Sequence, residues 1–497
     1  MIVGEVLRKT TERYGEKTAI IFEEQKISFT GLYQKVNRLS NGIINLGIKK
    51  GDRVAIFLPN CMECAISYLA LFNIGVIIVP IDFTSKKEGI KNILNHAEIS
   101  LLITRPTPRL SLEKVKDEVP DLEKIILCQG KQDGFLFFDQ IIEEASDLPP
   151  RVDISEQDHA AIFYTSGSTG SPKGIIWNFR HLDQAPKFFD YFLPVTDQDI
   201  KLCAVPFSHG GGLVYLQNCI VSGITVVIMR RFSPAEFLRN VERYKITCFH
   251  VVPAMFVAFV QLKEIEKYDL KSLRWVVVFG APSSEEILKR FGNYCSQAAL
   301  INGYGLMETA PPNTVCPLDK DKITSVGKPP PWIKIKVVDE DEREVPPGEV
   351  GEVVLKGWVV MEGYYKEPEL TANAIKDGWF HTGDLGLIDE DGDLSIVGRK
   401  KEVIIVGGLN VYATEVEEVL YLHPGVNEAA VIGLPDQMRG EVVKAVIVTK
   451  PGKKVSSREI IAYCREKLDN FKAPRVVEFR DSLPKTGSGK IAKRLLQ

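Results

Sequence analysis

Two kinds of apolar stretch alternate along the first three hundred residues. The longer ones recur every three to four positions and predict amphipathic or buried helices at residues 2–14, 30–46, 61–73, 234–244 and 254–262. Short unbroken runs rich in Val and Ile predict buried strands, as at residues 18–22, 76–79, 101–104, 160–163, 224–229, 249–252 and 275–279. Such an alternation is typical of layered α/β sheets.

The pattern changes twice toward the C-terminus. Residues 320–398 contain short β-prone runs separated by glycine turns, which predicts a β-rich subdomain. A charged break at Gly398-Arg-Lys-Lys401 precedes a small α+β domain, whose helices are expected to begin at the capping boxes Thr414-x-x-Glu417 and Ser456-x-x-Glu459. We therefore predict an α/β protein with an N-terminal domain at residues 1–398 and a small C-terminal domain at residues 399–497.

Composition narrows the class of protein. With 497 residues, 45% of them hydrophobic, the chain can bury sizeable cores, and its net charge of −3 argues against nucleic-acid binding. The nine cysteines are scattered, and the close pair Cys61-x-x-Cys64 lies in a helical pattern, so we expect buried thiols. Without a secretory leader or an apolar run of about 18 residues, we expect a cytoplasmic protein with no integral membrane segment.

The strand at 160–163 runs into the loop Tyr164-Thr-Ser-Gly-Ser-Thr-Gly-Ser-Pro-Lys-Gly174, which is rich in hydroxyls and glycines. Glycines let the backbone approach a ligand, and amides, hydroxyls and Lys173 suit an anion, so we predict a polyphosphate site. A flexible linker is disfavoured because an apolar run at 175–177 follows at once, as in a hairpin. The spacing fits neither the P-loop nor the Gly-x-Gly-x-x-Gly fingerprint, which disfavours a P-loop kinase and a Rossmann dehydrogenase.

Five further clusters carry candidate chemistry, and each has an ordinary structural alternative such as a tight turn or a surface lysine. They are His209 before three glycines, the strand end Phe279-Gly-Ala-Pro282, the turn Asn302-Gly-Tyr-Gly-Leu-Met-Glu308 with one carboxylate suited to Mg²⁺, Asp384 between Gly383 and Gly386, and Lys485 with Lys490 in a glycine loop.

Taken together and in this order, the clusters resemble the adenylate-forming superfamily, which includes acyl-CoA synthetases, luciferases and adenylation domains of peptide synthetases. The resemblance covers nearly the whole chain. It implies that a carboxylic acid and ATP give acyl-AMP and pyrophosphate, and that CoA then gives acyl-CoA and AMP. ATP, Mg²⁺ and CoA are the implied cofactor and co-substrates, small-molecule acids the implied partners, and a homodimer stays open.

The resemblance also assigns roles. The implied catalytic residues are Lys490, which would stabilise the transition state, His209, which would gate or orient the acyl group, and Glu308, which would hold Mg²⁺ with Thr165. The implied ATP and AMP contacts are Thr165, Ser166, Gly167, Ser168, Thr169, Gly170, Lys173, Gly280, Ala281, Pro282, Asn302, Gly303, Tyr304, Gly305, Leu306, Met307, Asp384, Arg399 and Lys490. Gly280 to Pro282 with Tyr304 would sandwich adenine, while Asp384 and Arg399 would bind ribose. The C-terminal domain would swing about a hinge at Lys401, and Gly407, Gly408 and Leu409 would line the CoA tunnel.

The implied acyl pocket is mostly apolar and comprises Phe207, His209, His250, Met255, Phe279, Gly303, Leu306 and Met307. Met307 replaces the family's usual threonine, which removes a hydroxyl near the α-phosphate and adds bulk toward the pocket. No aspartate is placed to pair an α-amino group, which disfavours an amino acid. Of the fatty and aromatic acids that this pocket allows, we expect a fatty acid of medium or longer chain. An aryl acid, delivery to a carrier protein, and a non-catalytic nucleotide-binding homologue are the alternatives.

Overall fold

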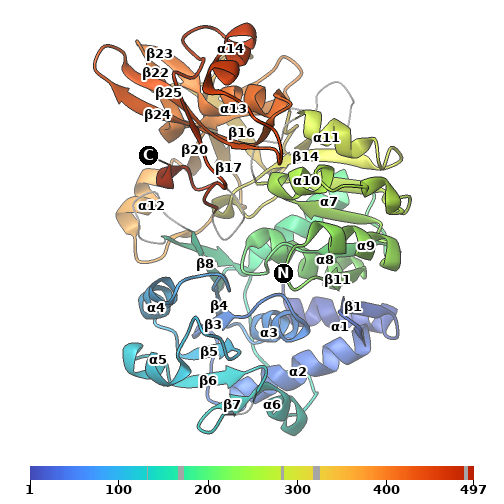
Figure 1. Ribbon diagram of the computed structural model, residues 1–497. Helices are drawn as coiled ribbons and strands as arrows, with labels where there is room; N and C mark the ends of the chain where they lie inside the picture. The colour runs from blue at the N-terminus through green and yellow to red at the C-terminus, as the bar shows by residue number, and fades with distance from the viewer. Residues whose placement is uncertain (131, 166–172, 281–284, 317–324, 486–490, 497) are drawn as a thin grey trace.

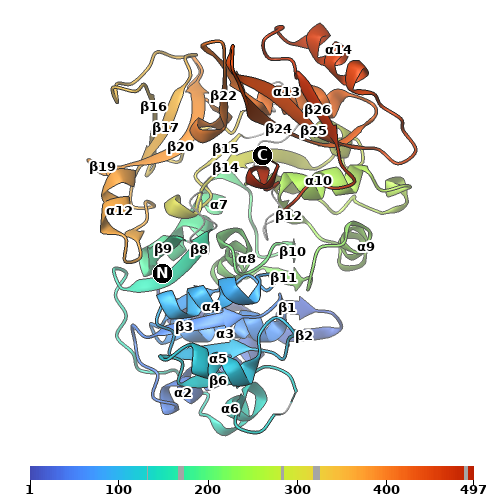
Figure 2. The same ribbon diagram turned by 60° about the vertical axis from the view of Figure 1, so that its left-hand side comes forward.

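The computed structural model describes residues 1–130, 132–165, 173–280, 285–316, 325–485 and 491–496. Its strands form two eight-stranded sheets, here sheets A and B, and two five-stranded sheets, here sheets C and D. Sheet B lies at one end of the molecule, sheets C and D lie at the other, and sheet A lies between them (Figures 1 and 2). The predicted α/β class with a smaller C-terminal part is confirmed. No helix in the described part of the chain is long and apolar enough to cross a membrane.

Sheet A has the strand order β15-β14-β13-β12-β10-β11-β1-β2. Its six inner strands are parallel, and an antiparallel strand closes each edge. The strands are β1 (Thr18–Phe22), β2 (Gln25–Ser28), β10 (Ile200–Cys203), β11 (Thr225–Ile228), β12 (Cys248–Val251), β13 (Trp275–Val278), β14 (Ala299–Tyr304) and β15 (Thr314–Cys316). Because the inner strands are parallel, their carboxyl ends open at one edge of the sheet.

Sheet B has the order β18-β9-β8-β4-β3-β5-β6-β7, and its strands β3 to β8 are parallel. The strands are β3 (Arg53–Phe57), β4 (Ile77–Pro80), β5 (Leu101–Thr104), β6 (Lys124–Leu127), β7 (Leu136–Phe137), β8 (His159–Thr165), β9 (Lys173–Asn178) and β18 (Gly363–Tyr364). Strands β8 and β9 pair antiparallel, which confirms the predicted hairpin around the phosphate loop.

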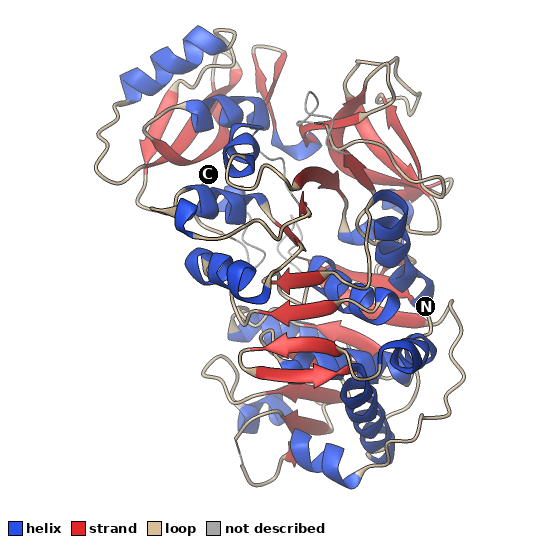
Figure 3. Cartoon of the chain, turned by 90° about the vertical axis from the view of Figure 1, so that its right-hand side faces the viewer, coloured by secondary structure: helices blue, strands red, loops and turns tan. Residues whose placement is uncertain are grey.

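Helices cover both faces of the two large sheets (Figure 3). The largest core joins residues of sheets A and B with those of helices between them, and smaller cores cover the outer faces. The inner helices are α1 (Val3–Tyr14), α2 (Phe29–Asn45), α3 (Met62–Asn73), α6 (Phe138–Glu144), α7 (Gln184–Phe192) and α8 (Gly210–Ser222). The outer helices are α4 (Lys87–His96), α5 (Leu112–Glu118), α9 (Pro234–Tyr244), α10 (Pro253–Val260) and α11 (Glu285–Gly292). All nine cysteines are buried free thiols, as predicted.

The C-terminal elements form the two smaller sheets. Sheet C contains β16 (Lys334–Val338), β17 (Gly351–Lys356), β19 (Ile375–Lys376), β20 (Trp379–Ile388) and β21 (Leu394–Arg399), with α12 (Pro368–Ala374) beside it. Sheet D contains β22 (Val403–Val406), β23 (Leu409–Tyr412), β24 (Val426–Asp436), β25 (Gly440–Thr449) and β26 (Val476–Phe479), with α13 (Ala413–Leu422) and α14 (Ser457–Lys467). Sheet C matches the predicted β-rich subdomain, while the domain boundary at Arg399 remains our prediction.

Only one of the two predicted capping boxes forms. Ser456 accepts the amide of Glu459 and caps α14, as expected. Thr414 does not cap α13. Its hydroxyl donates instead to the carbonyl of Val397, and the helix begins at Ala413, one residue before Thr414. A tertiary hydrogen bond thus replaces the local one.

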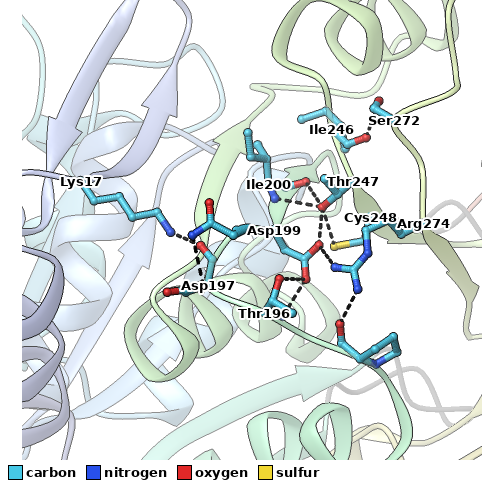
Figure 4. Close-up of polar contacts among 12 residues, drawn as sticks. Lys17, Thr196, Asp197, Asp199, Ile200, Ile246, Thr247, Cys248, Ser272 and Arg274 are labelled. Atoms are coloured by element: carbon cyan, nitrogen blue, oxygen red, sulfur yellow. Dashed lines mark hydrogen bonds and ion pairs between the residues drawn. The ribbon is translucent and has the colours of Figure 1, made fainter.

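A buried carboxylate fixes the amino-terminal edge of sheet A (Figure 4). Asp199, whose side chain is fully buried, accepts hydrogen bonds from the Thr247 hydroxyl and from Arg274 Nη1, each at 2.6 Å. These residues lie at the starts of β10, β12 and β13. The contacts therefore hold in place the three strands whose opposite ends carry candidate site residues.

Candidate functional site

The candidate residues gather where the carboxyl ends of sheets A and B approach each other. Thr165 ends β8 of sheet B, while His209, Gly280 and Glu308 follow β10, β13 and β14 of sheet A. Ligands bind beyond the carboxyl ends of parallel strands in open α/β sheets, so this placement fits a substrate site.

Asp384 links sheets A and C. Its Oδ2 accepts the hydroxyl of Tyr304 at 2.6 Å, and its Oδ1 accepts Nε of Arg399 at 2.7 Å. Asp384 and Arg399 face each other on β20 and β21, and the Asp384 side chain is 5% exposed. A buried carboxylate held by a phenol and a guanidinium is fixed in orientation, and carboxylate oxygens are strong acceptors for ligand hydroxyls.

Glu308 and Lys173 lie on either side of one tyrosine. The hydroxyl of Tyr364, on β18, donates to Glu308 Oε1 at 3.3 Å, and Lys173 Nζ lies 5.2 Å from the centre of the Tyr364 ring. Burial raises the pKa of Glu308, against the lowering effect of Arg399 and the Tyr364 hydrogen bond. One carboxylate and one ammonium from distant parts of the chain thus come together.

His209 faces a carboxylate that the sequence did not indicate. Its Nε2 lies 3.4 Å from Oδ2 of Asp82, which follows β4, and Asp82 Oδ1 accepts the amide and the hydroxyl of Thr84, both at 2.7 Å. Burial alone would raise the pKa of Asp82, but the hydrogen bonds from His209 and Thr84 prevail and lower it to about 2. Asp82 is therefore a fixed anion that orients the imidazole.

The turn after His209 requires small residues. A Cβ on Gly212 would lie 2.1 Å from the carbonyl oxygen of Pro206, so no side chain fits there. Met307 packs against the same turn, with its sulfur 3.3 Å from the amide of Gly210. Trp177 Nε1 donates to the carbonyl of Met307 at 2.7 Å and holds that residue in place.

The structure brings three members of the predicted acyl pocket together, namely His250, Phe279 and Gly303. His250 is stacked on Tyr215, and its Nε2 donates to the carbonyl of Gly211 at 2.6 Å. The Phe279 ring lies edge-on to His250 and covers Gly303, whose hypothetical Cβ would be 2.1 Å from that ring.

Other members of the predicted pocket and nucleotide site pack elsewhere. Phe207 is buried edge-on against Tyr68, and Met255 packs against the core on the opposite face of sheet A from His250. Leu306 contacts two cores, and Asn302 donates to the carbonyl of Ser325 at 3.3 Å.

Several predicted positions lie outside the described residues, namely Ser166, Gly167, Ser168, Thr169, Gly170, Ala281, Pro282 and Lys490. Gly407 and Gly408 form the turn between β22 and β23, and Leu409 begins β23 with half its surface exposed. This hairpin lies among the C-terminal elements (Figure 1), and Lys401 lies in the short 3-10 helix Lys400–Glu402 just before β22.

Sequence reasoning missed Asp82, Tyr364 and Trp177. Asp82 stands two residues beyond a buried parallel strand, a position from which it could have been identified by the same rule that singled out Gly280. Tyr364 and Trp177 carry no such local signal. Tyr364 lies on β18 and Trp177 on β9, two strands that are far apart in the sequence and pair only in the folded chain.

Comparisons with known proteins agree on one family. The model of the AMP-binding enzyme family matches residues 7–365, and that of the AMP-binding enzyme C-terminal domain matches residues 415–490. A long-chain-fatty-acid–CoA ligase of Bacillus subtilis (strain 168) is 33% identical over 99% of this chain and 93% of its own. A feruloyl-CoA synthase of an Amycolatopsis species is 34% identical over 96% of this chain and 94% of its own.

The solved structures agree. The anthranilate CoA ligase AuaEII in complex with anthranoyl-AMP superposes with a TM-score of 0.95 at 27% identity, over 100% of this chain and 96% of that one. Enzymes of this family use ATP and CoA, and the protein is an AMP-forming acid–thiol ligase. The chain therefore belongs to the AMP-binding enzyme family of adenylate-forming enzymes.

Proposed function

We propose that this acid–CoA ligase activates a medium- or long-chain fatty acid, with the residue roles set out below. The observation that best supports these roles is the junction of Tyr304, Asp384 and Arg399 near the converging carboxyl ends of sheets A and B. Asp384 would accept the ribose hydroxyls, and Arg399 would donate to the sugar or a phosphate. The loop before Lys173 would hold the β- and γ-phosphates that leave as pyrophosphate.

Glu308 suits a Mg²⁺ ion that accompanies ATP. Mg²⁺ prefers a few carboxylate oxygens, with water and phosphate oxygens filling its shell, and Glu308 offers one carboxylate steadied by Tyr364. Its raised pKa follows from burial without a bound cation, and a cation would favour the ionised form. A bound ion would neutralise phosphate charge, and Glu308 with Thr165 would hold it.

Two half-reactions would use the chain in turn. The substrate carboxylate attacks the α-phosphorus of ATP, the bond to pyrophosphate breaks, and Lys490 stabilises the charge that develops. The C-terminal domain then turns about Lys401 and brings Gly407 to Leu409 to the site. The CoA thiolate attacks the acyl carbonyl, AMP leaves, and His209, oriented by Asp82, lies where acyl group and thiol meet.

An apolar acyl pocket supports a fatty acid. The candidate wall comprises Phe279, His250 and Gly303, which has no side chain. Burial and the nearby Lys201 lower the pKa of His250 to about 3, so its imidazole is uncharged. The feruloyl and anthranilate relatives favour the second candidate, an aryl acid. Delivery to a carrier protein instead of free CoA is the third.

The first experiment compares products and substrates. The purified enzyme is given ATP, CoA and a panel of saturated and aromatic acids, and AMP, pyrophosphate and thioester are measured. We expect AMP and pyrophosphate in equal amounts, with the highest kcat/KM for fatty acids. Higher kcat/KM for aromatic acids would overturn the substrate, and activation without thioester on free CoA would favour a carrier protein.

The second experiment separates the half-reactions. We expect Lys490→Ala to abolish acyl-adenylate formation while it largely spares thioester formation from supplied acyl-AMP. Lys485→Ala is the matched control, since that side chain is exposed and pairs with Glu428 at 2.7 Å. Equal losses in both half-reactions of the Lys490 variant would contradict the two-position account.

A further inference from the structure

A lysine is buried in the interior of sheet A. Lys201, on β10, has no exposed surface, and its Nζ donates to Asn218 Oδ1 of helix α8 at 2.7 Å. The ammonium also lies 4.2 Å from the centre of the Phe189 ring and 4.7 Å from that of Trp275. Within the described residues it forms no ion pair. A buried ammonium is costly where no carboxylate binds it directly, and the buried Asp199 two residues earlier acts on it only from a distance, so this side chain calls for a reason.

Strand register places Lys201 below the candidate acyl pocket. Lys201 pairs with Cys248, and Cys248 pairs with Trp275, so the three form one row across β10, β12 and β13. Alternate residues of a strand share a face, so His250 stands on the same face one step nearer the carboxyl ends, about 7 Å away at the usual rise. Phe279 stands further along that face. The order from the opening inward is thus Phe279, His250 and then the row of Lys201.

The same region holds polar atoms for which the described residues offer no hydrogen-bond partner. They are Nδ2 of Asn218, Nε1 of Trp275 and Nδ1 of His250, whose side chains are buried and at most 4% exposed. Because His250 Nε2 donates to the carbonyl of Gly211, its Nδ1 is an acceptor. Leaving a buried donor or acceptor unsatisfied is costly, and each such group calls for an explanation, such as a bound water, ion or ligand atom.

Three side chains in this region carry N–H donors. Lys201, Asn218 and Trp275 supply N–H donors, and the ring of Phe189 packs beside both Lys201 and Trp275. Their surroundings are apolar and include Cys248, Val277 and Ile301. An aliphatic chain with an oxygen at its end matches this environment, because the methylene groups meet apolar walls and the oxygen meets the donors.

We propose that Lys201, Asn218 and Trp275 form a polar floor that binds an oxygen function at the far end of the acyl chain. The substrate is then an acid that carries a terminal or near-terminal hydroxyl, keto or carboxylate oxygen. This inference rests on the proposed function, since it assumes that the acyl chain enters past Phe279 and His250. To reach the floor the chain displaces the Phe279 ring, which covers Gly303.

The test uses acids of equal chain length that differ only at the far end. Plain, ω-hydroxy, keto and α,ω-dicarboxylic acids are compared by kcat/KM for AMP release, over several chain lengths. We expect at least one oxygenated series to exceed the plain acids by about tenfold, the effect of one hydrogen bond to a charged group. Preference for the dicarboxylates identifies a charge partner for Lys201, and preference for hydroxy or keto acids a neutral acceptor.

Variants tie the preference to the floor. In Lys201→Met and Asn218→Leu we expect the ratio of kcat/KM between oxygenated and plain acids to collapse toward one. Lys187→Met is the matched control, because Lys187 is exposed on α7 and lies 5.3 Å from the Trp358 ring, outside this region. Binding of non-hydrolysable acyl-AMP analogues with plain and oxygenated tails, measured by calorimetry, gives the same ratio without turnover.

The outcomes separate the two proposals. If no acid yields AMP and pyrophosphate, the proposed function fails. If plain acids are activated as well as every oxygenated series, or if the ratio survives in both floor variants, the inference is overturned and the floor holds water alone. Should Lys201→Met fail to fold, the wild-type panel and Asn218→Leu still decide.

Discussion

His250 should make the stability of the protein depend on pH. The imidazole is enclosed between Tyr215 and the Phe279 ring and donates through Nε2 to Gly211. Burial, helped by the nearby Lys201 ammonium, lowers the pKa of His250 to about 3, whereas an exposed histidine titrates near pH 6.5. The folded protein therefore keeps this ring neutral where the unfolded chain protonates it.

The sign and size follow from this difference. Because the folded pKa is the lower one, the unfolded state binds more protons between about pH 6.5 and pH 3. The contribution of His250 to stability is present above pH 6.5 and is lost as the pH falls toward 3. A pH of about 5 lies roughly 1.5 pH units below the pKa of an exposed histidine, so the unfolded imidazole is almost fully protonated there. The free energy of unfolding is therefore about 2 kcal/mol lower than at pH 7.5.

Urea unfolding at both pH values measures the effect. We compare wild type with His250→Gln, in which the amide can still donate to Gly211, and with His159→Gln, which alters an exposed histidine at the start of β8. Between about pH 7.5 and 5 the wild type and the His159 variant should lose about 2 kcal/mol more than the His250 variant. Equal losses in all three proteins would refute a neutral buried His250.

Four further substitutions test the site and its support. Asp384→Asn removes the charge that holds Arg399, so KM for ATP should rise about tenfold or more, measured by pyrophosphate release, and an unchanged KM would contradict the ribose role. Asp82→Asn should lower kcat about tenfold at saturating acid, because the imidazole of His209 loses its fixed anion, while Thr84→Ala should lower it less. Asp199→Ala should lower the free energy of unfolding by about 2 kcal/mol, a value that is reduced because Arg274 is partly exposed. A calorimetric measurement that finds no loss of stability would contradict the role of Asp199 in holding the strands.

Local signals predicted the elements, and tertiary contacts decided the rest. The phosphate-loop hairpin and the Ser456 cap follow from neighbouring residues, and both form. Thr414 carries the same capping signal, but its hydroxyl donates to the carbonyl of Val397, 17 residues earlier in the chain. A sequence pattern is reliable where its partners are local and fails where a distant group offers the better hydrogen bond.

The candidate site shows the same division. Glu308 follows the end of β14, beside glycines that the sequence marks plainly, whereas Asp384, which we expected in a glycine turn, lies within strand β20. The partners of site residues carry no such mark, because Tyr364 reaches Glu308 only after β18 pairs with β9, and Asp82 meets His209 only where two sheets meet. The sequence shows that Lys201 is a lone lysine in the apolar strand β10. Its hydrogen bond to Asn218 on α8 becomes visible only in the structure.

The residues proposed for the nucleotide and those proposed for the acid differ in how many sheets they come from. Nucleotide candidates come from sheets A, B and C, through Tyr304, Lys173 and Asp384, so any change in how the sheets meet alters several contacts at once. Acyl candidates such as His250 and Phe279 lie on one face of sheet A. Because that face can change without moving the sheets, acid preference can diverge among relatives while ATP binding persists. The fatty, feruloyl and anthranilate ligases that share this fold are consistent with such a separation.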